Sequence, residues 1–91
     1  MKQVAKYEVT LAATFNVTMP INAVVLTAAT PLTELTPCLI WALIDPDEQT
    51  TEQRDFISVS DDEDISDASP AYVATVMVGG QTDDFRHIFE V

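Results

Sequence analysis

Apolar and polar residues alternate with a period of two along most of the chain. In the first such run, Tyr7 and Val9 alternate with Lys6 and Glu8. This period is typical of β-strands that bury one face. The pattern predicts seven strands, over residues 6–11, 14–19, 23–28, 38–44, 54–60, 72–78 and 85–91.

Turn residues separate these runs. Ala12-Ala13 is short enough to join the first two strands as a hairpin, although it lacks the Asn-Gly chemistry that tight hairpins favour. Pro20 ends the second strand, because proline has no N–H to donate to a ladder. Asp45-Pro46-Asp47 and Gly79-Gly80 are predicted turns.

The number and spacing of these runs predict the fold class. Seven short strands with turns between them indicate an all-β protein, a single small antiparallel sandwich or open barrel over residues 1–91. A chain of this length forms one domain and buries roughly 60–65% of its unfolded surface. At most one or two short helical turns are expected, near residues 32–35 and 61–68.

The run at residues 38–44 differs from the others because it is apolar on both faces. Such a run is typical of a central strand covered on both sides. We expect Trp41 to be the largest anchor of the core. We expect Cys38 to be a buried, inert thiol.

Composition limits the class of protein. The hydrophobic fraction is 47%, which is ordinary for a globular chain and too high for a disordered one. The lone cysteine does not fit a disulfide scaffold. The opening residues do not read as a signal peptide, and the apolar runs are too short to span a bilayer. These features predict a soluble protein that is made in a cytoplasm and stays or assembles there.

Charge is the most unusual feature of the composition. The formal net charge is -11, and ten of the fifteen carboxylates lie between residues 45 and 67, with Arg54 as the one basic residue among them. Such a surface repels nucleic acid and acidic lipid, and four basic residues argue against direct nucleic-acid binding. The candidate binding residues are Asp45, Asp47, Glu48, Glu52, Asp55, Asp61, Asp62, Glu63, Asp64 and Asp67.

Two interpretations of this acidic surface remain open. Densely spaced carboxylates can imitate the phosphates of DNA and occupy the basic groove of a nucleic-acid-binding protein. Alternatively, the carboxylates form a solvated surface that keeps a small protein soluble. A dedicated calcium site is not favoured, because residues 61–67 lack the alternating spacing and the glycine of such loops.

Other chemistry is sparse. His87 lies on the Phe85/Phe89 face of the last strand, where we expect a packed, hydrogen-bonded histidine. One histidine and one cysteine do not make a usual structural zinc site, and Cys38 would need a base such as His87 within reach to act as a nucleophile. We therefore predict no enzymatic activity, no cofactor and no metal.

Four short segments of the chain carry a resemblance to other proteins. They are Lys6-Tyr7, Met19-Pro20-Ile21-Asn22-Ala23, Cys38 with Ile40-Trp41-Ala42-Leu43-Ile44-Asp45, and His87-Ile88-Phe89-Glu90. Together these segments resemble a family of small proteins of unknown function encoded by tailed phages and prophages. The resemblance implies a phage origin and a compact β domain. Such proteins often carry an aromatic-Gly-Thr-Gly-His turn where this chain has residues 58–64, so the acidic loop is expected to be particular to this protein.

Charge and resemblance together lead to two functional hypotheses. The first is a non-enzymatic, phage-encoded acidic binding protein that inhibits a basic host target, such as a defence nuclease, a CRISPR effector, a polymerase or a nucleoid protein. The alternative is a small structural or decoration component of the phage virion, which would bind phage structural proteins. The expected location is the host bacterial cytoplasm or the virion, with no membrane contact. The sequence sets neither the target nor the oligomeric state.

Overall fold

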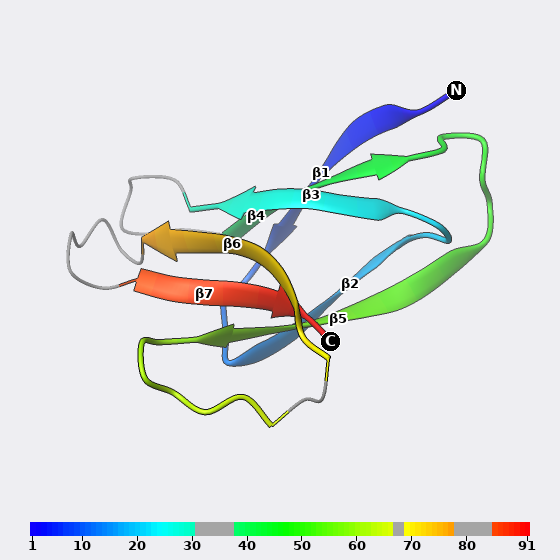
Figure 1. Cartoon of the computed structure of the whole chain (residues 1–91). Coiled ribbons are helices and arrows are strands. Elements are labelled where there is room, and N and C mark those ends of the chain that lie inside the picture. Colours follow the sequence, from blue (N-terminus) through cyan, green and yellow to red (C-terminus); the bar gives the residue numbers. More distant parts are fainter. Residues whose placement is uncertain (31–37, 67–68, 78–84) are drawn as a thin grey trace.

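Seven strands form two antiparallel sheets that pack face to face (Figure 1). The computed structural model describes residues 1–30, 38–66, 69–77 and 85–91. One sheet has three strands in the order β1-β4-β3, and the other has four in the order β2-β5-β7-β6. The strands are β1 (Gln3–Val9), β2 (Thr14–Pro20), β3 (Val24–Ala29), β4 (Cys38–Ile44), β5 (Thr51–Val59), β6 (Ala71–Met77) and β7 (Phe85–Glu90).

This architecture confirms the predicted all-β sandwich, and the two sheets do not close into a barrel. The largest shifts in strand boundaries are in β1 and β5, which begin three residues earlier than predicted, at Gln3 and Thr51. No described residue belongs to a helix long and apolar enough to cross a membrane. Residues 61–66 contain a turn and no helical turn. The helical turn expected near residues 32–35 and the Gly79-Gly80 turn lie outside the described residues.

The predicted hairpin between the first two strands is wrong. β1 pairs with β4 and β2 pairs with β5, so the connection between β1 and β2 crosses from one sheet to the other. Ala12-Ala13 lacks the residues that close a tight hairpin. Instead, Ala13 accepts a hydrogen bond from the Ser58 amide at 3.0 Å, and Ala12 accepts one from the Ser58 hydroxyl at 2.6 Å. These bonds hold the connection on β5.

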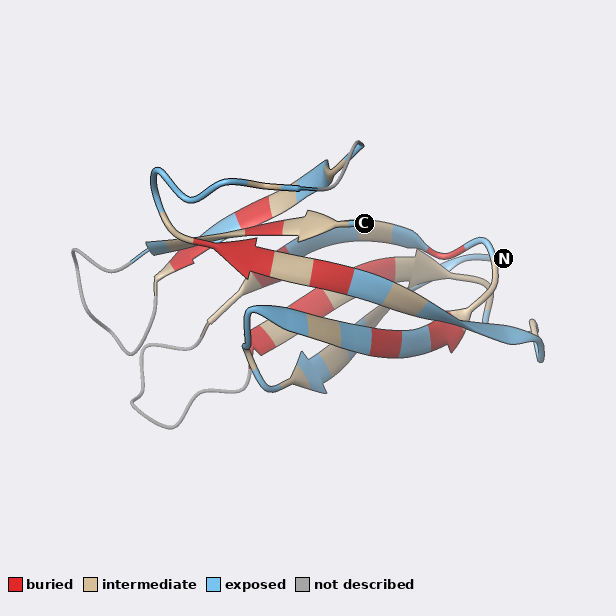
Figure 2. Cartoon of the chain, turned by 90° about the horizontal axis from the view of Figure 1, so that it is seen from below, coloured by how far each residue is buried: buried red, intermediate tan, exposed pale blue. Residues whose placement is uncertain are grey.

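The core lies between the sheets and takes alternate residues of most strands, visible as separate red bands in Figure 2. Phe56 is its largest fully buried side chain and stacks on Phe15, with ring centroids 5.4 Å apart. The buried members of the cluster are Val17, Met19, Ala23, Ala28, Cys38, Ile40, Ala42, Phe56, Ala74, Val76 and Ile88.

Strand β4 is central in its sheet, as predicted, but the described residues cover only one of its faces. Cys38, Ile40 and Ala42 are fully buried. Leu39, Trp41 and Leu43 alternate with them and are only partly buried. Trp41 is therefore not the anchor of the core, which corrects the prediction. A run that is apolar on both faces does not tell which face turns inward.

Candidate acidic binding surface

The predicted acidic residues fall into two groups at opposite ends of β5 (Figure 1). The first group lies in the turn before β5, residues 45–50, and the second in the loop after it, residues 60–66. The strand between them advances about 26 Å from Thr51 to Val59. Asp67 lies outside the described residues. The first group is Asp45, Asp47 and Glu48, the second is Asp61, Asp62, Glu63 and Asp64, and Glu52 and Asp55 lie on β5 itself.

The first group is ordered by its own hydrogen bonds, and the predicted turn is confirmed. The Asp47 amide donates to Asp45 Oδ1 at 3.0 Å, which forms an Asx-turn. The Glu48 amide donates to the Asp45 carbonyl at 3.1 Å, and the Thr50 amide donates to Glu48 Oε1 at 3.0 Å. These bonds fix the carboxylates of Asp45 and Glu48, and both residues remain partly exposed.

The second group begins with a tight turn. The Glu63 amide donates to the Ser60 carbonyl at 3.3 Å, and Asp62 has a φ of 65°, as type II turns require at their third position. Glu63 Oε1 accepts from the Ser60 amide at 3.0 Å and from the Ser60 hydroxyl at 3.1 Å. The amide and then the hydroxyl lower the pKa of Glu63. Glu63 thus closes the turn in its charged form.

A chain of hydrogen bonds ties the same loop to the outer face of the four-stranded sheet. His87 Nε2 lies 2.5 Å from Asp61 Oδ1, and His87 Nδ1 lies 2.9 Å from Thr75 Oγ1. The Thr75 hydroxyl is in turn 2.8 Å from the Tyr72 hydroxyl. The expected hydrogen bonding of His87 is confirmed. The sequence did not indicate that its partner would be a residue of the acidic loop.

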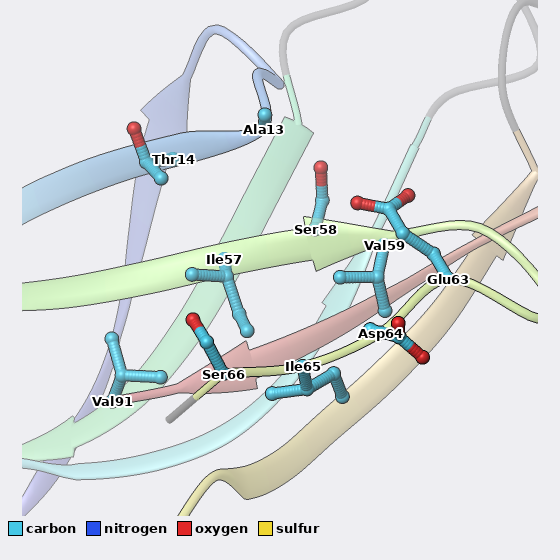
Figure 3. A pocket seen from close by; sticks show the side chains of 10 residues that line it. All are labelled: Ala13, Thr14, Ile57, Ser58, Val59, Glu63, Asp64, Ile65, Ser66 and Val91. Carbon is cyan, nitrogen blue, oxygen red and sulfur yellow. The ribbon is translucent and has the colours of Figure 1, made fainter.

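A pocket of about 390 Å³ lies between this loop and β5 (Figure 3). Ile57, Val59 and Ile65 give it an apolar wall, and the carboxylates of Glu63 and Asp64 lie at one end. Within the described residues Asp64 makes no hydrogen bond or ion pair. Lys and Arg side chains combine an apolar stem with a charged head. The pocket therefore suits the side chain of a basic residue.

Sequence reasoning missed this pocket, because it exists only when the loop folds back over β5. Ile65 is the signal that could have found it. It is the only large apolar residue between Ser60 and Pro70, and it is partly buried although its neighbours Asp64 and Ser66 are exposed.

The remaining candidates do not form a reactive site. Cys38 is fully buried on the inner face of β4, and burial raises its pKa to about 11. His87 lies on the outer face of the opposite sheet, so the two side chains are not neighbours. In the part of the chain that the structure describes, no three His, Cys, Asp or Glu side chains gather closely enough to hold a metal ion.

The fold and its surface define a class of protein, a small β-sandwich with two ordered groups of carboxylates and a pocket with an acidic rim. The chain belongs to the family described as a domain of unknown function (DUF7352), whose model matches residues 1–91. This match agrees with the predicted membership of an uncharacterised family. No curated protein and no solved structure matches the chain.

Proposed function

We propose that this chain is a non-enzymatic, phage-encoded protein that binds and inhibits a basic host protein. One observation carries the proposal: the acidic loop is folded over β5 so that Asp64 and Glu63 edge a pocket with an apolar wall. A lysine or arginine of the partner would place its stem against Ile57 and Ile65 and its charge near the carboxylates. The four segments that resemble phage proteins support the phage origin.

The charge of the chain supports the same partner class. A net charge of -11 steers a basic partner toward the protein and accelerates association at low ionic strength. The one basic residue within the acidic stretch, Arg54, is mostly buried and paired, so it does not weaken the surface. Suitable partners are proteins whose own ligand is nucleic acid, such as a nuclease, a CRISPR effector, a polymerase or a nucleoid protein.

The geometry favours contact at separate points over a continuous track of charge. A duplex carries about 15 phosphates over 26 Å of its axis. Between Asp45 and Asp64 the chain offers nine carboxylates, seven of them in the two end groups. Mimicry of nucleic acid would therefore rest on two acidic ends, placed to meet two basic regions of one groove.

The test begins with a pull-down from bacterial host lysate with tagged protein, at low and high salt and with nuclease added. One basic, nucleic-acid-binding protein is expected, lost at high salt and resistant to nuclease. Recovery of nothing, or of capsid and tail proteins only, would contradict the inhibitor hypothesis.

Two matched triple variants then locate the contact on the captured partner. The first changes Asp61, Asp62 and Asp64 to Asn and keeps Glu63, because Glu63 closes the turn. The second makes the changes Asp45→Asn, Asp47→Asn and Glu48→Gln, which remove the same charge at the other end of β5. The first variant should weaken binding about tenfold, as expected for three exposed ion pairs. Unchanged binding in the first variant would show that the pocket loop is not the contact.

A second candidate function is a small structural component of the virion. The observation that favours it is the exposed apolar face of the three-stranded sheet, which offers an interface without charge attraction. Such a component would copurify with particles in many copies, and high salt would not release it.

A further inference from the structure

The outer face of the three-stranded sheet is apolar along its middle. The register aligns Val4, Leu43 and Val24 in one cross-strand row. The next two rows are Lys6-Trp41-Thr27 and Glu8-Leu39-Ala29. These nine residues, with Leu26 at the irregularity in β3, are called the outer face below.

No described residue covers this face. Val4 is 60% exposed, Val24 55% and Leu26 46%. Trp41, the only tryptophan of the chain, stands in the central row and is partly buried. The face measures about 14 Å across its three strands and about 20 Å along them, which gives a planar area of about 300 Å². Apolar patches of this size on a monomer are often contact sites.

The distribution of charge indicates what covers it. β1, β3 and β4 carry only Lys6 and Glu8 as charged side chains, one of each sign, so the strands of this sheet have a net charge of zero. The whole net charge of -11 therefore lies elsewhere, mostly in the loops. A basic partner has no electrostatic reason to choose this face. A second copy meets no like-charge excess on it.

We propose that two copies of this chain associate through the outer face, in a symmetric dimer of four stacked sheets. A two-fold arrangement brings the same patch of both copies together, with Trp41 near its centre. A two-fold axis that runs along β4 in the interface places Trp41 over Trp41 of the other copy, Val4 over Val24 and Lys6 over Thr27, so all three rows are covered.

The acidic loop at residues 60–66 does not oppose this dimer. Sheets pack about 10 Å apart, so the two four-stranded sheets would lie roughly 30 Å from each other. That separation exceeds the Debye length of about 8 Å at physiological ionic strength. The dimer would thus keep the two loops at residues 60–66 apart, and it does not depend on the proposed inhibitory function.

The planar area of the face predicts a weak dimer. Standard interfaces bury about 800 Å² per partner and bind with µM to pM affinity, so for this smaller face we expect a dissociation constant of about 1 µM or weaker. Sedimentation equilibrium of the full chain from 1 to 300 µM should show a monomer–dimer equilibrium. Trp41 emission should shift to shorter wavelength over the same range, because the dimer removes this side chain from water.

Salt separates this inference from the proposed function. Binding of a basic partner through carboxylates weakens as salt rises, whereas the dimer should be equally strong or stronger at 500 mM NaCl, because salt screens repulsion between two chains of charge -11. A monomer at 300 µM in both salts would overturn the dimer and leave the inhibitor hypothesis intact. A dimer that dissociates in high salt would also overturn it.

Matched variants locate the interface. Val24→Lys and Leu26→Lys place a charge on exposed positions of the outer face, and each should weaken the dimer at least tenfold and abolish the concentration dependence of Trp41 emission. Thr18→Lys adds the same charge at an exposed position of β2 in the other sheet and should leave the dimer unchanged. Circular dichroism confirms that each variant is folded. A dimer that tolerates both outer-face variants, or that only Thr18→Lys disrupts, would overturn the proposal.

Discussion

The guanidinium of Arg54 on β5 pairs with the carboxylate of Glu90 on β7, through Nε to Oε2 and through Nη2 to Oε1, the latter at 3.0 Å. Nη1 of the same side chain donates to the Ala23 carbonyl at 2.8 Å. The Arg54 side chain is only 18% exposed. The one basic residue of the acidic stretch is therefore used inside the sandwich, where it joins two strands and the turn before β3.

Removal of either partner of this pair should destabilise the protein. Arg54→Met leaves Glu90 and the Ala23 carbonyl without their donor, and hydrogen bonds to charged groups contribute about 1.5–3 kcal/mol each. We expect Arg54→Met to lower the free energy of unfolding by about 2–3 kcal/mol, measured by urea denaturation.

A double-mutant cycle with Glu90→Gln tests whether the two residues act together. The double variant should be less destabilised than the sum of the single variants, because each single change already breaks the pair. Strict additivity would show that Arg54 acts through the Ala23 carbonyl alone. Glu52→Gln is the matched control, since its exposed contact with Arg54 at 3.3 Å should contribute little.

The two largest aromatic candidates for the core should differ in their effect on stability. Phe56 is 1% exposed and stacks on Phe15, so Phe56→Ala should cost about 3–5 kcal/mol. Trp41 lies on the outer face and fills no space between the sheets. Trp41→Ala should therefore cost clearly less in dilute solution, where the protein is monomeric. Equal losses in urea denaturation would contradict the placement of Trp41.

The strands were predictable because alternation is a local property of the sequence. The partners of the strands were not. The first alternating run continues through Leu11 in the sequence, but β1 ends at Val9 and the chain then crosses to the other sheet. Which strand lies beside which depends on contacts between distant residues, such as Ser58 with Ala12 and Ala13. No pattern near Ala12 contains that information.

The candidate site was predictable in composition and not in shape. Counting carboxylates identified the acidic residues, but their separation into two ends follows from the length of β5. The roles of individual side chains also depend on the fold. Glu63 closes its own turn and Asp61 pairs with His87, 26 residues away. Among the described carboxylates of this loop only Asp62 and Asp64 make no hydrogen bond or ion pair with another described residue.

The Cys38 thiol should be unreactive in the folded protein. Burial raises its pKa to about 11 from an ordinary value of 9.0, so at pH 8 almost no thiolate is present, and the reagent has no access. Modification by a disulfide reagent should follow the rate of unfolding and become fast in denaturant. Rapid modification of the native protein at pH 8 would contradict the buried position.

The Cys38 thiol should also make the free energy of unfolding depend on pH in the alkaline range. Its pKa in the folded state lies above its value in the unfolded state, so folding favours the neutral thiol. This contribution is fully present below about pH 9 and is lost as the pH rises through about 11. The wild-type chain should therefore lose stability relative to Cys38→Ala between about pH 9 and pH 11. Lysines and tyrosines titrate in both chains, so their effect cancels in this comparison. Parallel stability profiles of the two chains would exclude a contribution from Cys38.

Asp62 and Asn22 offer a matched pair for the cost of left-handed backbone in the loops. Both stand at the third position of a tight turn, with φ of 65° and 64°. Glycine adopts this region without a steric penalty, whereas a side chain costs on the order of 1 kcal/mol, less for Asn and Asp than for alanine. We expect Asp62→Gly to leave stability unchanged or to raise it by up to about 1 kcal/mol, and Asp62→Ala to lower it.

The same substitutions at Asn22 separate backbone strain from charge. Asn22→Gly and Asn22→Ala change the backbone preference without changing the net charge, whereas the changes at Asp62 also remove one carboxylate from a crowded loop. If strain dominates, the loss in unfolding free energy from Gly to Ala should be equal at the two positions. The free energy of unfolding could instead rise more for Asp62→Gly than for Asn22→Gly, with a difference that shrinks at 500 mM NaCl. That difference would measure the repulsion among Asp61, Asp62 and Asp64. That repulsion is the stability cost that the acidic loop imposes on the fold, and a basic partner would relieve it on binding.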